Sequence, residues 1–211
     1  MTASFKMAKL DFYTLKGQLA AYLIMPVVAY MFLSMNSSAL LLGFTAMWLV
    51  LIINMNLFTL EEKYHLERLY SMLAVSRKQL ILGRYLSTTL NFVVGFIFIF
   101  ATTIIFSIIN KQVIIWQDIL VGFLVSFFGF SIVSAIQLPI YFGFGYSRGR
   151  FLSILPFLIL VGGIGLSSVN EKIAKVIHFV LSNDVSFLYL AGGILILGIS
   201  YLLSLVCYKK Q

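Results

Sequence analysis

Few residues of this chain carry side chains that could do acid–base, metal or nucleophilic chemistry. Among 211 residues there are 7 Asp and Glu, 2 His and 1 Cys. The nearest approach to a catalytic group is the adjacent pair Glu61 and Glu62, with His65 three positions later. Paired carboxylates with nearby histidines can bind a metal ion or carry general acid–base catalysis. Such a site would need the second histidine, His178, on the same side of any membrane that the chain crosses.

Charged residues are absent from six long apolar segments and are confined to the stretches between them. Each segment approaches or exceeds the roughly 18–20 residues that cross a ~30 Å hydrocarbon core as a helix. The chain is 61% hydrophobic and 10% charged, against about 25% charged for average soluble domains. We therefore predict an all-α membrane protein with a single transmembrane domain over residues 1–211. The predicted spans are Leu19–Met35, Ala39–Leu60, Tyr85–Ile109, Ile119–Phe144, Phe151–Ser168 and Val185–Cys207.

The positive charges are distributed unequally between the two sides of these spans. With the N-terminus inside, 12 of the 15 Lys and Arg residues fall on the inner side, and only Lys111, Lys172 and Lys175 fall outside. Cytoplasmic loops carry such an excess, so we predict a multi-pass protein of the cell membrane with both termini in the cytoplasm. The net charge of +8 therefore indicates topology and contact with anionic lipid, and not nucleic-acid binding.

This topology removes most of the chemistry that the charged residues could support. It places His65 inside and His178 outside, so the two histidines cannot share a metal ion or relay one proton. No phosphate-binding loop of the form G-x-x-x-x-G-K-[ST] occurs in the sequence, so we predict neither ATP binding nor a metal or cofactor in this chain. The spans also lack the ionisable residues of a proton or ion relay. An intramembrane enzyme and a secondary transporter or channel remain as alternatives.

Three segments outside the spans have the pattern of surface helices. Residues 1–16 predict a short helix in the inner interface, and residues 168–184 predict an outer helix between spans five and six. The cytoplasmic region 61–76 has apolar residues at i, i+3, i+4 and i+7 from Leu66, with charges of both signs on its other face. Anionic lipid would favour a uniformly basic face, so this pattern favours docking to a soluble partner. Ser76 and Gln79 then form a capping box that opens the next helix.

Several neutral polar residues lie within the spans. They are costly facing lipid, so we expect them to face other helices. They could be interhelical hydrogen-bonding groups or could line a translocation path near the inner side. The four candidates for the path are Asn54, Asn56, Asn91 and Gln137.

The layout resembles that of the permease subunits of the ABC type-2 transporter family, of the small bacterial kind without its own ATPase. The resemblance rests on six spans after an interfacial helix, on the outer helical element, and on the cytoplasmic stretch EEKYHLERLYSMLAVSR at 61–77. That stretch is similar to the family's acidic start, amphipathic coupling helix and Val-Ser-Arg exit. The family often has a proline before that exit, whereas this chain has Ala74.

The resemblance implies that two such membrane subunits, as a homo- or heterodimer, dock through coupling helices to separate cytoplasmic ATPase subunits, which would bind ATP and Mg²⁺. The expected docking residues are Glu61, Glu62, Tyr64, His65, Arg68 and Leu69. The expected function is export of a hydrophobic or amphipathic substrate such as a cytolytic or antimicrobial peptide. Antibiotic or lantibiotic efflux or immunity is the alternative within the family.

The charge asymmetry makes the topology testable by labelling in intact cells. Cysteines introduced at Lys111 and Lys175 should react with a membrane-impermeant thiol reagent, because both positions are predicted to face outward. A cysteine at Lys78 should remain unlabelled until the cells are opened. Labelling at the Lys78 position alone would show that the predicted topology is wrong.

Overall fold

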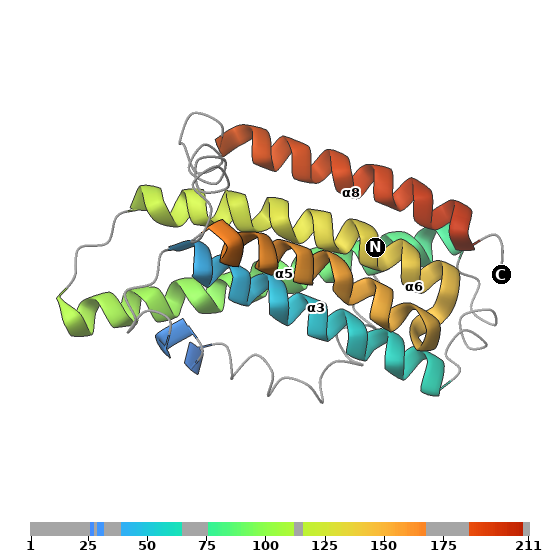
Figure 1. The fold of residues 1–211 in the computed structure, drawn as a ribbon, viewed down its shortest axis with the longest axis horizontal. Coiled ribbons are helices and arrows are strands. Elements are labelled where there is room, and N and C mark those ends of the chain that lie inside the picture. Colours follow the sequence, from blue (N-terminus) through green and yellow to red (C-terminus); the bar gives the residue numbers. More distant parts are fainter. Residues whose placement is uncertain are drawn as a thin grey trace.

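The computed structural model describes residues 26–27, 29–31, 39–64, 76–111, 116–167 and 186–208. Most of this part of the chain forms long helices that lie side by side along the longest axis of the molecule (Figure 1). The predicted helices of 1–16 and 168–184 lie outside the described residues, as do positions 65–75 of the coupling-helix region. The long helices are α3 (Ala39–Lys63), α5 (Arg77–Asn110), α6 (Trp116–Ser167) and α8 (Ser186–Tyr208).

Helix α5 begins where the sequence predicts a helix start. Ser76 is the N-cap, its hydroxyl accepts the N–H of Gln79, and the Gln79 side chain accepts the N–H of Ser76. This reciprocal pair satisfies two backbone donors that would otherwise lack partners. The helix runs to Asn110, and Lys111 then closes it in a left-handed conformation. The predicted third span, Tyr85–Ile109, thus forms the C-terminal part of a longer helix.

Helix α6 is interrupted at Gly145, where the backbone has φ 73° and ψ 174°, a combination that is essentially restricted to glycine. The chain turns back there, and the yellow and orange parts of α6 run in opposite directions in Figure 1. The hydroxyls of Tyr141 and Ser153 lie 2.8 Å apart, whereas twelve residues of continuous helix would separate them by about 18 Å. Helix α6 therefore has a first limb (116–144) and a second limb (146–167), close to the predicted fourth and fifth spans.

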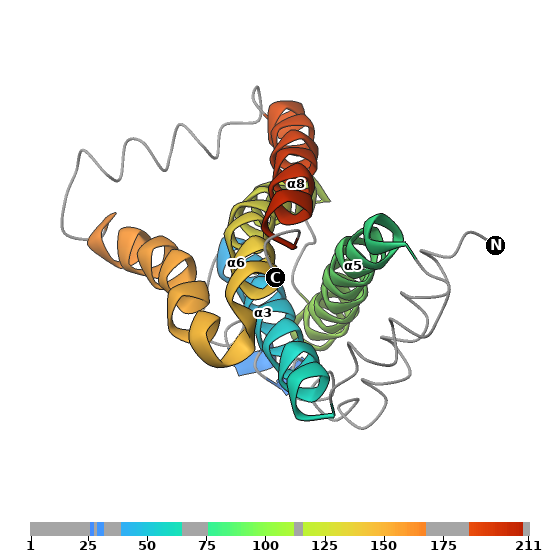
Figure 2. The same cartoon turned by 90° about the vertical axis from the view of Figure 1, so that its right-hand side faces the viewer.

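The first limb of α6 packs between α3 and α8, as Figure 2 shows along the helices. One core cluster combines aliphatic residues such as Val50, Ile53 and Leu57 with phenylalanines, and Phe92 of α5 stacks on Phe130 of α6 with ring centroids 4.6 Å apart. Helices α6 and α8 approach closely at Gly193, where an added Cβ would lie 2.8 Å from the Ser131 hydroxyl oxygen. The absence of a side chain at Gly193 thus allows the close approach of the two helices.

Among the described residues, three helical stretches are long and apolar enough to cross a membrane by length and composition. They are Arg77–Asn110, Ile119–Pro156 and Leu188–Tyr208, and the middle one contains the Gly145 corner. The all-helical fold and the membrane class are therefore confirmed for the part of the chain that the structure describes. The full set of six spans remains a prediction.

The corner at Gly145 can be tested by comparing two glycine-to-alanine variants. Neither Gly145 nor Gly198 of α8 has any atom within 4 Å of the position that a Cβ would occupy, but only Gly145 has a positive φ. Gly145→Ala should therefore lower the free energy of unfolding by about 1–3 kcal/mol through backbone strain alone. Gly198→Ala should be neutral or slightly stabilising, because alanine favours a helix over glycine. Denaturant unfolding in detergent micelles measures both, and equal stabilities would contradict the role assigned to Gly145.

Candidate functional site

The C-terminal end of α3 carries two adjacent carboxylates that bind two different elements. Glu61 forms an ion pair with Arg84 of α5, with 2.7 Å between Glu61 Oε2 and Arg84 Nη2. Both residues are buried, with 8% and 3% exposure. The Arg84 guanidinium also lies over the Phe58 ring, 5.3 Å from its centroid. This cluster joins the end of α3 to the first turns of α5.

Glu62 reaches the α6 corner instead. The backbone N–H of Ser147 donates to Glu62 Oε2 at 2.9 Å, and the Ser147 hydroxyl donates to Glu62 Oε1. Ser147 lies in the first turn of the second limb, whose backbone N–H groups have no partners within that helix. Glu62 therefore caps the second limb from another helix and places a negative charge at its positive end.

The same contacts determine the ionisation of Glu62. The hydrogen bond from the Ser147 hydroxyl holds the pKa of the Glu62 carboxyl below its usual value of 4.5, aided by backbone N–H groups of Ser147 and Tyr146. Partial burial acts in the opposite direction and is outweighed. Glu62 is thus a carboxylate at neutral pH.

A buried chain of hydrogen bonds begins one turn deeper in the bundle. Thr88 of α5 donates to the Asn54 side-chain oxygen at 3.0 Å. The Asn54 amide then donates to the Gln137 side-chain oxygen of α6 at 3.2 Å. Asn54 and Gln137 are each 1% exposed, so these bonds connect α5, α3 and the first limb of α6 in an environment without competing water.

The chain continues into the second limb of α6. The Gln137 amide donates to the Tyr141 hydroxyl at 3.3 Å, and the Tyr141 hydroxyl lies 2.8 Å from that of Ser153. Ser153 donates to the backbone carbonyl of Arg150 at 2.8 Å, so the proton between the two hydroxyls belongs to Tyr141. Each side chain in this series of hydrogen bonds therefore donates to the next one, from Thr88 of α5 to Ser153 of the second limb.

Helix α8 is attached by a separate hydroxyl cluster. The Tyr85 hydroxyl lies 2.5 Å from Ser200 Oγ and 2.8 Å from Ser204 Oγ. Ser200 also donates to the Ala135 carbonyl of α6 at 2.8 Å. These contacts join α5, α6 and α8 near the end of the molecule that carries Glu61 and Glu62.

The structure places the predicted path residues and the predicted docking residues in different surroundings. Asn54 and Gln137 are brought together by a direct hydrogen bond, Asn91 is buried one turn of α5 beyond Thr88, and Asn56 is half-buried. Of the predicted docking residues, Glu61 is turned inward, Glu62 binds the α6 corner and Tyr64 is 62% exposed. The docking assignment remains a prediction, and three of its residues lie outside the described residues: His65, Arg68 and Leu69.

Sequence reasoning did not identify Arg84, Ser147, Tyr141 or Ser153. For Arg84 a signal was present, because opposite charges stand at neighbouring ends of the second and third predicted spans on the same side of the membrane. Ser147, Tyr141 and Ser153 depend on where the chain turns back. The predicted spans leave residues 145–150 for the turn, but the sequence does not decide between Gly145 and Gly149 within it.

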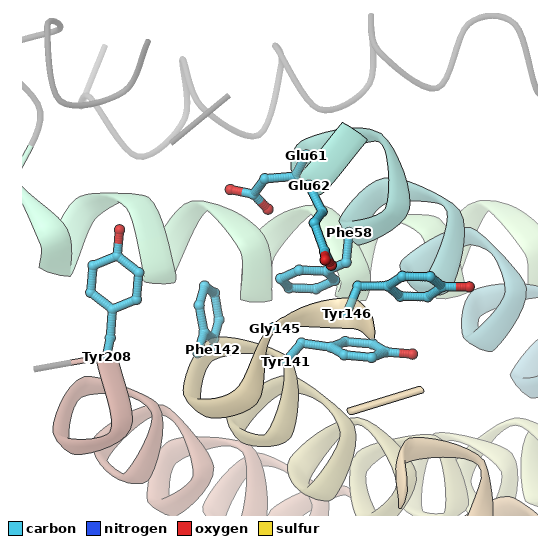
Figure 3. Close-up of a pocket in the computed structure, with 8 residues that line it drawn as sticks. All are labelled: Phe58, Glu61, Glu62, Tyr141, Phe142, Gly145, Tyr146 and Tyr208. Carbon is cyan, nitrogen blue, oxygen red and sulfur yellow. The ribbon is translucent and has the colours of Figure 1, made fainter. Parts of the chain in front are cut away.

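A cavity of about 330 Å³ opens beside the two carboxylates (Figure 3). It lies between the end of α3, the α6 corner and the last residue of α8. Five aromatic rings and two carboxylates make up most of its wall. The lining residues are Phe58, Glu61, Glu62, Tyr141, Phe142, Gly145, Tyr146 and Tyr208.

Comparison with known families identifies one match. The family described as ABC-2 family transporter protein matches residues 6–209, almost the whole chain. Searches of curated proteins and of solved structures gave no significant match.

The buried ion pair can be tested by a double-mutant cycle. Arg84→Met and Glu61→Gln should each lower stability, Arg84→Met by about 3–5 kcal/mol, because it removes the positive charge that pairs with the buried Glu61 carboxylate. The double variant should be markedly more stable than the sum of the two losses predicts, since neither charge then remains. Unfolding in detergent measures all three. Additive losses would show that the two side chains do not interact in the folded protein.

Proposed function

The chain belongs to the ABC-2 transporter family, and we propose on that basis that it is the membrane subunit of an ATP-driven exporter. The observation that supports this proposal most directly is the family match over residues 6–209. Members of this family are membrane transport subunits and not ATPases, and this chain is a multi-pass membrane protein with apolar helices. The energy for transport therefore comes from a separate ATPase subunit in the cytoplasm.

We further propose that region 61–76 is the coupling segment that docks to this ATPase. The contacts of Glu61 and Glu62 support the proposal, because they join the start of the segment to α5 and to the second limb of α6. A displacement of the docked segment would act on both elements at once. The protein would then work as a dimer of two membrane subunits in a bacterial cell membrane, with both termini in the cytoplasm.

The proposed cargo is a hydrophobic or amphipathic molecule such as a cytolytic or antimicrobial peptide. Asn56 is the best remaining candidate for the translocation path, since it is only half-buried. The side chains of Asn54 and Gln137 are hydrogen-bonded to each other. For either residue to line a path, this hydrogen bond would have to break. We therefore assign these two to the packing of α3 against α6.

Reconstituted complexes test the energy source. Liposomes with the chain and its partner ATPase should export an amphipathic peptide with ATP and Mg²⁺, and should not do so with a proton or sodium gradient alone. A complex carrying Arg68→Glu should hydrolyse ATP while transport falls at least about tenfold, because the docking contact is reversed. Arg68 is preferable to Glu62 here, since Glu62 also caps α6.

The matched control is Lys78→Glu, an exposed charge in the first turn of α5 outside the proposed docking segment, which should transport at the normal rate. Transport sustained by an ion gradient without nucleotide would contradict the exporter proposal. Normal transport by the Arg68→Glu complex would contradict the docking assignment alone.

A further inference from the structure

The cavity beside Glu61 and Glu62 has the composition of a site for a positively charged organic group. Its rings come from three elements, Phe58 from α3, three from the α6 region around the corner, and Tyr208 from α8. Ring faces carry partial negative charge and attract cations, and cages of several rings bind quaternary ammonium groups. A volume of about 330 Å³ falls at the lower end of the range for small-molecule pockets.

Two guanidinium groups already lie against rings of this cage. Arg84 lies 5.3 Å from the centroid of Phe58, and Arg77 lies 5.7 Å from that of Tyr208. Neither arginine lines the cavity. Two of the rings therefore already take part in cation–π contacts, and the cavity itself is lined by rings and carboxylates.

The net charge of the cavity wall is negative. Arg84 neutralises Glu61 through the 2.7 Å ion pair. Glu62 accepts hydrogen bonds from uncharged donors of Ser147 and Tyr146. Among the described residues, no cation lies within ion-pair distance of its carboxylate. Figure 3 shows the Glu62 carboxylate directed toward the rings of Phe58 and Tyr146. Within the part of the chain that the structure describes, the Glu62 carboxylate at the mouth of the aromatic cage thus has no ion-pair partner.

The two ends of the cavity differ in their access to solvent. Phe58, Tyr141 and Phe142 at its base are buried, with 2–6% exposure, whereas Glu62 at the mouth is exposed and Tyr146 and Tyr208 are half-buried. A ligand can therefore enter past Glu62 and place its charged group against rings that are shielded from water, where cation–π attraction is strongest.

We propose that this cavity binds an organic ammonium group, with the aromatic rings around the cation and Glu62 as its counter-ion. The ammonium can belong to a free small cation or to the headgroup of a choline lipid, and these share one chemistry of recognition. The proposal requires no ATPase partner, so its failure would leave the proposed exporter function intact.

Binding of choline to the purified full-length chain tests the proposal. The chain is placed in nanodiscs of phosphatidylglycerol, which has no ammonium group, and choline is titrated by calorimetry. Choline should bind, and its neutral isostere 3,3-dimethyl-1-butanol should bind at least about fivefold more weakly, because it has the same shape without the charge. Equal binding of the two would overturn the proposal and leave only an apolar pocket.

Variants locate the site. Tyr208→Leu should weaken choline binding about two- to fivefold, whereas Tyr208→Phe should preserve it, because the ring and not the hydroxyl attracts the cation. Glu62→Gln should weaken binding at least about fivefold. Phe144→Leu, which removes an exposed ring next to the corner but outside the cavity, should have no effect. Unchanged affinity in both Tyr208→Leu and Glu62→Gln would overturn the proposal.

The lipid environment separates the two sources of the ammonium group. If a lipid headgroup is the occupant, nanodiscs of phosphatidylcholine should suppress choline binding. If a free cation is the occupant, choline affinity should be the same in both lipids. Thermal unfolding of each variant, measured alongside, identifies any that fails to fold, and the Tyr208→Phe and Tyr208→Leu pair remains decisive should Glu62→Gln be such a variant.

Discussion

The arrangement of the helices at one end of this protein depends on two consecutive carboxylates of α3. Successive side chains of an α-helix point about 100° apart, so neighbouring residues cannot face the same partner. Glu61 therefore reaches Arg84 of α5, and Glu62 reaches Ser147 at the start of the second limb of α6. A single turn of α3 thus contacts the N-terminal parts of two other elements. Without these contacts, the buried Arg84 would lose its ion pair and the first turn of the second limb would lose its cap.

The hydrogen-bonded chain from Thr88 to Ser153 adds specificity to this arrangement. Polar contacts between membrane helices contribute only about 0.6 kcal/mol each on average, so the chain is a minor source of stability. Its geometry matters more, because an amide such as Gln137 accepts from one neighbour and donates to another only in one rotational setting of its helix. The chain therefore selects one register between α3 and the two limbs of α6.

The sequence was sufficient to predict the helical membrane class, the family and the start of α5, because each depends on local pattern. Long charge-free segments, the distribution of lysines and arginines, and the Ser76–Gln79 capping box can all be recognised without tertiary contacts. The sequence also predicted that Asn54 and Gln137 would face other helices, but it could not select them as partners of each other across 83 positions.

The candidate site was less predictable because it depends on the corner of α6. Gly145 alone among the described glycines has a positive φ. The predicted spans place the turn between Phe144 and Phe151, but the sequence does not decide between Gly145 and Gly149 within it. The choice of corner decides which residues begin the second limb, and so decides that Ser147 binds Glu62 and that Tyr146 faces the cavity. A shift by one residue would rotate the second limb by about 100° and would remove both contacts.

Polar contacts between helices gather toward the Lys63 end of α3, where they lie beside an apolar core that includes Phe58, Leu138 and Phe142. Farther along the bundle the packing includes ring contacts among Phe92, Phe123 and Phe130. Ring contacts have broad energy minima and tolerate small displacements, whereas hydrogen bonds weaken steeply with angle. A displacement of the end of α3 is therefore passed to α5 and α6 most directly through these directional polar contacts. In the exporter that we propose, they lie next to the segment that docks to the ATPase.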